Sequence, residues 1–235
     1  YYQYNDVKKL IFSEKIRLED VSFRYKNNLP NIYENINFQI TKGTKIGILG
    51  KTGVGKSTLL DLIMGLLHPT SGKIYVDDSP IEQNNMSLWR KKVTHVPQDI
   101  FLINGSILEN IALGFKNEEI DRDKAEDCAK KSEIFDFIHS LPDQFNETVG
   151  ERGIKLSGGQ KQRIGIARAL YRESELIVLD EATNALDTRT EKKIIDSIDK
   201  LENITIIIVA HRIDTLKICD KIYEVKKNTI TEVNI

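Results

Sequence analysis

Hydrophobic and polar residues follow two different periods along this chain, and their order predicts an α/β protein. Two β-rich segments, Ile16 to Phe23 and Ile32 to Ile40, are separated by an Asn-Asn-Leu-Pro turn at residues 27–30, and this arrangement predicts a pair of antiparallel strands. A short apolar strand at Ile46 to Leu49 precedes a glycine-rich loop, and apolar residues at helical spacing follow it until His68-Pro69. The predicted order here is strand, loop, helix.

The rest of the chain predicts a parallel sheet with a helical insertion. Continuous apolar segments alternate with helical ones, which is typical of parallel strands covered by helices on both faces. In chain order, we expect short strands at Lys73 to Val76 and Val93 to Val96, charged helical sequence at Asp121 to His139, a helix from Ser157 to about Leu170, a buried strand at Leu176 to Leu179, a helix at Glu191 to Leu201 and a buried strand at Ile204 to Ala210.

Composition narrows the class of protein. The 235 residues include 34 Lys and Arg against 35 Asp and Glu, a formal net charge of −1, which excludes a protein held to nucleic acid by bulk charge alone. No apolar segment approaches the roughly 20 residues that cross a bilayer, and the two cysteines, Cys128 and Cys219, have no paired spacing, so we expect a soluble chain in a reducing compartment. Because the chain begins at Tyr1 and shows no signal sequence, we expect a piece of a longer protein.

The glycine-rich loop at residues 50–57 predicts a phosphate-binding site. It reads Gly-Lys-Thr-Gly-Val-Gly-Lys-Ser and lies between a predicted strand and a predicted helix, as the phosphate-binding pattern requires. Glycines let backbone N–H groups approach the phosphates, and the positive end of the following helix favours negative charge. Lys56 would reach the β and γ phosphates, and the Ser57 hydroxyl suits Mg²⁺, a hard cation that prefers oxygen ligands. A merely flexible turn explains this pattern less well.

Two acids follow a buried strand at Asp180-Glu181. The carboxyl end of a parallel strand lies at the ligand crevice of an α/β sheet, and successive residues point in opposite directions. Asp180 therefore suits the shell of a Mg²⁺ ion, and Glu181 suits positioning and deprotonating an attacking water. Two acids alone would more often be a solvated strand end, but the phosphate loop upstream favours the functional interpretation.

A second glycine-rich helix start, Leu-Ser-Gly-Gly-Gln at residues 156–160, provides one anion site more than a single nucleotide needs. Ser157 also suits an N-cap, and both interpretations can hold together. With these three motifs in place, the chain is similar over nearly its whole length to the nucleotide-binding domain of an ABC transporter. Residues 50–57 match the Walker A motif, 176–181 the Walker B motif with its catalytic glutamate, and 156–160 the family's signature motif.

The resemblance extends to shorter motifs in the same order. Tyr25 matches the aromatic residue that stacks on adenine, Gln98 the glutamine that senses Mg²⁺ and the membrane domain, residues 184–187 the D-loop, and His211 the switch histidine that contacts the γ phosphate. Asn184 departs from the serine that usually begins the D-loop, which affects only the expected communication between sites.

The resemblance implies a complete set of site residues for ATP and Mg²⁺. The catalytic residues would be Lys56, Gln98, Glu181 and His211, and the Mg²⁺ ligands Ser57, Gln98 and Asp180. The nucleotide-binding residues would be Tyr25, Gly50, Lys51, Thr52, Gly53, Val54, Gly55, Lys56, Ser57, Thr58, Ser157, Gly158, Gly159 and Gln160.

The family resemblance also implies a fold and partners. The fold would be a P-loop NTPase (RecA-like) parallel-sheet core, with an antiparallel β part at about 14–45 and a helical signature subdomain at about 99–170, all within one domain at 1–235. Two such domains would pair head to tail, as a homodimer on ATP binding, so that Ser157 and Gly159 contact the partner's nucleotide. The resemblance places the domain on the cytoplasmic face of the membrane, bound to a transmembrane domain, with no nucleic acid partner.

Two segments indicate the exporter branch, in which ATP hydrolysis drives transport across a membrane. Residues 101–110 and 148–153 resemble exporter-type domains, and 106–114 resembles the flippases for lipid-linked oligosaccharides. The main alternative is a non-transport ABC ATPase acting on DNA or ribosomes. The DNA-repair type would carry a long coiled coil between Lys56 and Leu156, where no heptads are sustained, and the ribosomal type usually holds two domains in one chain. A regulatory domain without turnover is disfavoured by Glu181 and His211.

Overall fold

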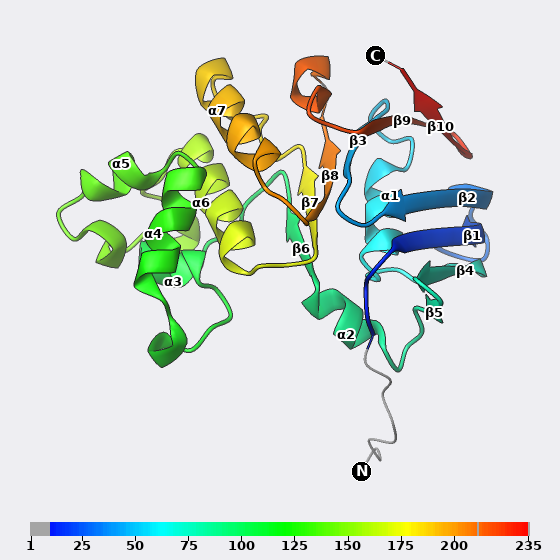
Figure 1. Ribbon diagram of the computed structural model, residues 1–235, viewed down its shortest axis with the longest axis horizontal. Helices are drawn as coiled ribbons and strands as arrows, with labels where there is room; N and C mark the ends of the chain where they lie inside the picture. Colours follow the sequence, from blue (N-terminus) through cyan, green and yellow to red (C-terminus); the bar gives the residue numbers. More distant parts are fainter. Residues whose placement is uncertain (1–9, 211, 235) are drawn as a thin grey trace, which may run out of the picture. The chain divides into compact units, whose positions relative to one another are not determined.

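The computed structural model describes residues 10–210 and 212–234, and these form two compact units. Unit 1 runs up to Thr94 and includes Glu175–Val178 and the chain from Asn203 onward. Unit 2 contains His95–Ser174 and Leu179–Glu202. The chain crosses from one unit to the other more than once, including within two of its strands. Each unit is therefore built from segments that are far apart in the sequence (Figure 1).

Unit 1 contains most of the strand residues of both sheets and the helix that follows the phosphate loop. Its elements are β1 (Lys15–Phe23), β2 (Tyr33–Thr41), β3 (Lys45–Leu49), α1 (Lys56–Ile63), β4 (Ser71–Val76), β5 (Ser79–Pro80), α2 (Met86–Lys91), the first residues of β6 (Val93–Val96) and of β7 (Leu176–Asp180), β8 (Thr205–Val209), the 3-10 turn η4 (Ile213–Leu216), β9 (Lys221–Lys226) and β10 (Thr229–Val233).

An antiparallel sheet of order β2-β1-β4-β5 opens unit 1. The register pairs Ile16 with Ile40 and Leu18 with Phe38, and all four side chains are buried. Along β2, buried and exposed residues nearly alternate, which is the pattern of a strand with one face on the core. The antiparallel pair predicted from the sequence is confirmed.

The second sheet has the order β10-β9-β3-β8-β7-β6. β3 pairs in parallel with both β8 and β9, while β9 and β10 form an antiparallel hairpin at the edge. All five residues of β8 are buried, as its continuous apolar sequence predicts for a central parallel strand. β9 and β10 were not predicted from the sequence, because they carry few buried residues.

The core of unit 1 surrounds α1. Its buried leucines and Ile63 belong to one apolar cluster with residues of β1, β2, β3 and β8. Trp89 of α2 is fully buried, meets the Phe12 ring edge-on at 5.6 Å between centroids, and donates its indole N–H to the carbonyl oxygen of Ile63 at 2.8 Å. This bond satisfies a carbonyl in the last turn of α1, so α2 fixes the C-terminal end of that helix.

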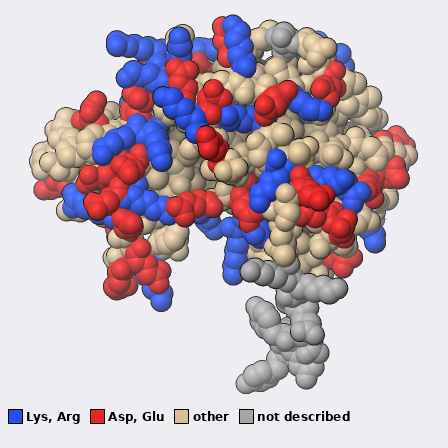
Figure 2. Space-filling model, in the orientation of Figure 1, with Lys and Arg blue, Asp and Glu red and all other residues tan. Residues whose placement is uncertain are grey.

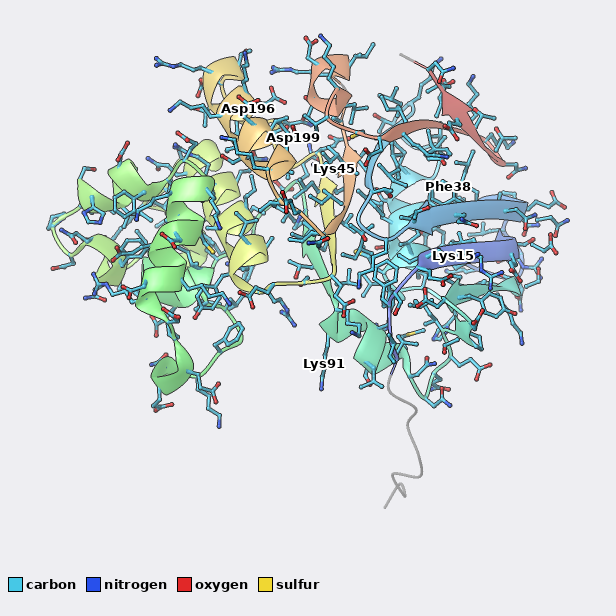
Figure 3. The ribbon with its side chains drawn as sticks, in the orientation of Figure 1. Lys15, Phe38, Lys45, Lys91, Asp196 and Asp199 are labelled. Carbon is cyan, nitrogen blue, oxygen red and sulfur yellow. The ribbon has the colours of Figure 1, made fainter. Side chains whose placement is uncertain are left out.

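Unit 2 is mainly helical. Its elements are the ends of β6 and β7, then α3 (Ile107–Ile111), η1 (Asn117–Glu119), α4 (Arg122–Lys131), α5 (Phe135–His139), η2 (Gln144–Asn146), η3 (Glu151–Gly153), α6 (Gly158–Tyr171) and α7 (Thr188–Asp199). Ser106 and Glu109 form a capping box at the start of α3, and Ser157 and Gln160 form another at the start of α6. On α7, Asp196 and Asp199 lie on the exposed face (Figure 3).

A buried polar cluster fixes α3 against α6. Asn110 is fully buried, and its amide bonds the backbone N–H and carbonyl of Ile103 at 2.9 and 3.1 Å. Arg168 donates from Nε to the Asn110 carbonyl at 2.8 Å and from Nη1 to the Phe101 carbonyl at 3.0 Å. Burial lowers the pKa of Arg168 to about 10, so the guanidinium stays charged at neutral pH.

Together, the antiparallel sheet, the sheet built around parallel strands and the helical unit confirm the predicted fold class. Basic and acidic residues are interspersed on the face shown in Figure 2, without a large area of one sign. No helix of the described residues is long and apolar enough to cross a membrane.

Candidate functional site

The predicted phosphate loop joins β3 to α1 in unit 1. Gly55, the N-cap of α1, has a left-handed backbone with φ of 112°, and the loop also requires glycine at Gly50, where a Cβ would lie 2.6 Å from the Val225 carbonyl oxygen. Within the described residues, no side chain caps the first turn of α1. The backbone N–H groups at this helix start therefore form an anion site without a side-chain competitor.

The Lys56 ammonium lies within this loop. Its Nζ donates to the carbonyl oxygens of Gly50 at 2.9 Å and Lys51 at 3.1 Å, and the residue is only 8% exposed. Both partners of this buried ammonium are neutral carbonyl groups. A phosphate group bound in the loop would give the ammonium an anionic partner. The donor set thus fits a polyphosphate: glycine N–H groups, a helix start and one cation.

Tyr33 of β2 holds the end of the loop, a role that the sequence did not reveal. Its side chain is fully buried, and its hydroxyl donates to the Gly55 carbonyl at 3.0 Å, which also accepts the first helical bond of α1 from Leu59 N–H at 2.9 Å. Burial raises the pKa of Tyr33 above its ordinary value, so the phenol stays protonated and acts as a donor. A tyrosine within a strand gives no local signal of this contact.

Tyr25, the predicted adenine-stacking residue, lies beside the same helix. Its ring is 55% exposed and packs edge-on against Phe23 at 5.0 Å, and its hydroxyl shares a hydrogen bond with the Thr58 hydroxyl at 3.0 Å. Thr58 is buried next to Ser57, which is exposed. The tyrosine ring is thus fixed on α1 with exposed surface available for a planar ligand, and stacking on adenine stays a prediction.

In unit 2, Glu181 occupies a strained position directly after β7. Its φ of 53° is left-handed, and the turn is closed by Asn184, whose backbone N–H donates to the Glu181 carbonyl at 3.1 Å. The Asn184 side chain donates from Nδ2 to Glu181 Oε2 at 2.8 Å. The D-loop asparagine that departs from the family pattern therefore orients the carboxylate predicted to act as general base. Asp180, the last residue of β7, is half-buried.

The signature segment begins α6 with a reciprocal cap. The Ser157 hydroxyl accepts the Gln160 backbone N–H at 3.3 Å, and Gln160 Oε1 accepts the Ser157 N–H at 2.7 Å. A pocket of about 480 Å³ opens there, lined by residues 157–159 and by the D-loop through Ala185 and Asp187. The structural role of Ser157 as a cap is present, and its predicted contact with a second chain's nucleotide stays a prediction.

Gln98 and Gln162 complete this part of unit 2. The carbonyl of Gln98 accepts a hydrogen bond from Gln162 of α6, a residue that the sequence analysis did not single out. A polar residue on the buried side of an otherwise apolar helix face is the signal that could have identified it. His211 lies outside the described residues.

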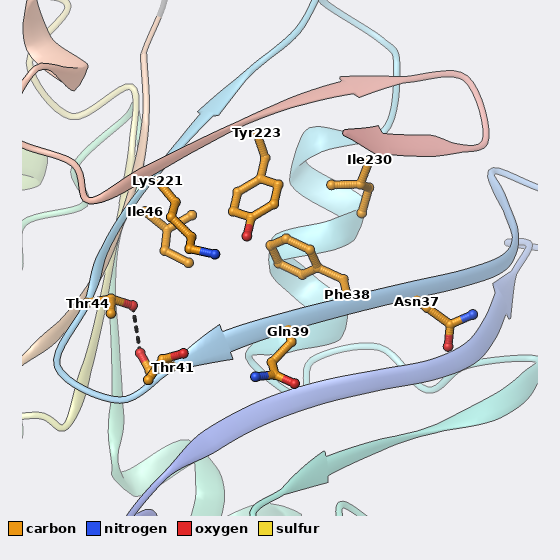
Figure 4. Close-up of a pocket in the computed structure, with 9 residues that line it drawn as sticks. All are labelled: Asn37, Phe38, Gln39, Thr41, Thr44, Ile46, Lys221, Tyr223 and Ile230. Carbon is orange, nitrogen blue, oxygen red and sulfur yellow. Dashed lines mark hydrogen bonds between the residues drawn. The ribbon is translucent and has the colours of Figure 1, made fainter. Parts of the chain in front are cut away.

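Another pocket, of about 310 Å³, lies in unit 1 and contains none of the predicted site residues (Figure 4). It lies between β2 and the β9–β10 hairpin, where the Phe38 and Tyr223 rings meet edge-on at 4.9 Å. Lys221 and Tyr223 both bond Glu232, at 3.3 and 3.5 Å. The described residues contain no cluster of three or more His, Cys, Asp or Glu that could hold a metal ion.

Comparison with known proteins gives consistent matches. The family model described as "ABC transporter" matches residues 33–184. The chain is 37% identical over 221 residues to ABC transporter B family member 29, chloroplastic, of Arabidopsis thaliana, covering 94% of this chain and 35% of that protein. It is 36% identical over 219 residues to the ATP-dependent lipid A-core flippase of Chromohalobacter salexigens, covering 93% and 38%.

Among solved structures, a bacterial Atm1-family ABC exporter with ATP bound superposes with a TM-score of 0.89 at 35% identity. That match covers 95% of this chain and 39% of the exporter chain. The chain thus spans between 35% and 39% of the length of these three proteins.

Proposed function

The chain belongs to the ABC transporter family, and from that premise we propose that it binds and hydrolyses ATP to drive an ABC exporter. The observation that carries the proposal is the phosphate loop, in which the Lys56 ammonium lies against the carbonyls of Gly50 and Lys51 at an uncapped helix start. Such a loop binds the phosphates of a nucleotide through backbone N–H groups and one lysine.

The proposed roles follow the chemistry of each residue. Lys56 exchanges its two carbonyl partners for the β and γ phosphates, and Tyr25 offers a ring surface to the base. Glu181, oriented by Asn184, positions and deprotonates the attacking water. Mg²⁺, when bound, neutralises phosphate charge, and its proposed ligands are the side-chain oxygens of Ser57, Gln98 and Asp180.

The working form is proposed to be a head-to-tail pair of such chains. The signature segment supports this, since the glycines of residues 158–159 line an open pocket beside the D-loop rather than a buried surface. A helix start with glycine N–H groups there suits the phosphates of a nucleotide held by the other chain. We propose that the two chains are identical and form a homodimer.

Coupling to a membrane is proposed from the relatives. The flippase and the Atm1-family exporter are both longer than this chain, and both are transport proteins by name. We therefore propose that a transmembrane domain binds this chain at the cytoplasmic face of a membrane.

The test is the Mg-dependent ATPase rate of the chain across protein concentrations, with Glu181→Gln as the variant. If two chains share each site, specific activity rises with concentration, and Glu181→Gln abolishes turnover while ATP still binds. A flat dependence would count against the shared site, and unchanged turnover in Glu181→Gln would remove Glu181 from the role of general base. If the isolated chain binds ATP without turnover, the wild type and Glu181→Gln are compared in the complete protein.

A further inference from the structure

Gln162 of α6 bridges two backbone segments of unit 2 that carry predicted site residues. Its Nε2 donates to the Gln98 carbonyl at 3.3 Å, and its Oε1 accepts the Ala185 backbone N–H at 3.1 Å. The residue is 4% exposed. Because a carbonyl can only accept and a backbone N–H can only donate, the two partners fix which end of the amide faces which segment.

Two glycines of α6 bring the same segments close to the helix on either side of Gln162. A Cβ on Gly165 would lie 2.5 Å from Cδ1 of Ile100, two residues after Gln98, and a Cβ on Gly159 would lie 3.2 Å from the Ala185 carbonyl oxygen. Residues 159, 162 and 165 recur every third position, which places neighbours on one side of a helix. This side of α6 is therefore shaped for both segments.

The contacts continue from the D-loop to the carboxylate. Ala185 directly follows Asn184, whose side chain donates to Glu181 Oε2 at 2.8 Å. An unbroken series of hydrogen bonds and one peptide link thus runs from the Gln98 carbonyl through Gln162 to Glu181. A shift of the Gln98 segment would move the Ala185 N–H, and with it the orientation of the Asn184 amide.

We propose that Gln162 is a positioning residue that couples the Gln98 segment to the D-loop and thereby sets the orientation of the Glu181 carboxylate for hydrolysis. This inference rests on the proposed ATPase function. Gln162 touches no reacting group itself and acts through Ala185 and Asn184. Its loss should therefore slow the chemical step and leave ATP binding nearly unchanged.

The first test replaces Gln162 with Met in the complete protein, which keeps the side-chain length and removes both hydrogen bonds. We expect kcat to fall roughly tenfold, while KM for ATP changes by less than about twofold. The matched control is Gln39→Met on the exposed face of β2, which should change neither constant. An unchanged kcat in a folded Gln162→Met protein would overturn the inference.

The second test uses a pH profile, which a purely structural role would not move. In Gln162→Glu, the ionised carboxylate can accept from Ala185 but cannot donate to Gln98, and protonation restores a donor. The ratio of its kcat to the wild-type kcat should therefore rise as pH falls from about 8 to 6, since burial raises the pKa of such a carboxyl group. The charged side chains near this position are Arg163, Glu181 and Asp187, and both proteins contain all three. A flat or falling ratio would contradict the coupling, and Gln39→Glu should give a flat one.

A third variant keeps the inference testable if neither Gln162 protein folds. Gly165→Ala forces Ile100 to move and should lower kcat and speed hydrogen exchange at the Ala185 amide. Unchanged kcat and exchange would overturn the coupling. If the wild type shows no Mg-ATP turnover and Glu181→Gln is indistinguishable from it, the proposed function itself has failed, not the coupling.

Discussion

Removing the Tyr33 hydroxyl tests whether the strand β2 supports the phosphate loop. In Tyr33→Phe the ring and its packing remain, and one hydrogen bond of 3.0 Å to the Gly55 carbonyl is lost. A buried neutral hydrogen bond contributes about 0.5–1.5 kcal/mol to the free energy of unfolding. The Gly55 carbonyl keeps its bond from Leu59 N–H, so it is not left unpaired, and we expect the lower half of that range.

The same loss should appear in nucleotide binding. If Gly55 relaxes by even a few tenths of an ångström, the N–H groups of the loop lose alignment with the phosphates, and a change of about 0.5–1 kcal/mol corresponds to a two- to fivefold weaker ATP affinity. The assay is a pair of equilibrium measurements, urea unfolding and binding of a fluorescent ATP analogue. Thermal unfolding should shift by about 1–4 °C for a chain of this size.

Tyr223→Phe is the matched control. Its hydroxyl makes a longer contact, 3.5 Å to Glu232, and the residue is half-buried at the pocket beside β2 rather than at the phosphate loop. Its unfolding free energy should change by less than about 0.5 kcal/mol, and its ATP affinity should not change. If Tyr33→Phe matches this control in both stability and ATP affinity, Tyr33 does not support the loop and the reasoning is refuted.

Three further substitutions probe separate features. Tyr25→Ala should weaken ATP binding about threefold to tenfold, as loss of one aromatic stacking contact does, whereas unchanged affinity would restrict Tyr25 to its contact with Thr58. Trp89→Phe should lower the free energy of unfolding by about 2 kcal/mol, measured in urea, because it leaves the Ile63 carbonyl unpaired and a cavity behind. Hydrogen bonds from Thr190 and the Arg189 N–H lower the pKa of Asp187, so its stabilisation of α7 is present above about pH 4 and lost as pH falls through the folded value. The Asp187→Asn protein should lack this acid-dependent part of the free energy of unfolding. Equal losses of unfolding free energy in both proteins between about pH 7 and 3.5 would contradict the prediction.

The sequence predicted those parts of the fold whose period is strong. The apolar run at β8 and the leucines of α1 are local patterns that survive in the structure because burial follows them. The β9–β10 hairpin was missed because only Val225 is buried in it, so it carries almost no apolar contrast. The start of α7 was predicted three residues late because the N-cap Asp187 bonds the N–H groups of the first turn.

The site residues also divide into those with a local sequence pattern and those without one. Glycines, Lys56 and the acids after β7 were predicted from their types and spacing, since each of these chemistries needs particular residues in a fixed local order. Tyr33 and Gln162 depend on partners 22 and 23 residues away, which only the folded chain brings within reach. No local pattern encodes such partners, apart from a polar residue on an apolar helix face.

The two carbonyl contacts of Lys56 tie its ammonium to the backbone of the same loop in which it would meet a phosphate group. A cation that organises the loop backbone and also receives the ligand has two functions on one atom. Replacing Lys56 would therefore alter the loop's resistance to proteolysis even in nucleotide-free solution, before any phosphate is added. The phosphate affinity of such a variant would combine the missing charge with the free energy of reordering the loop.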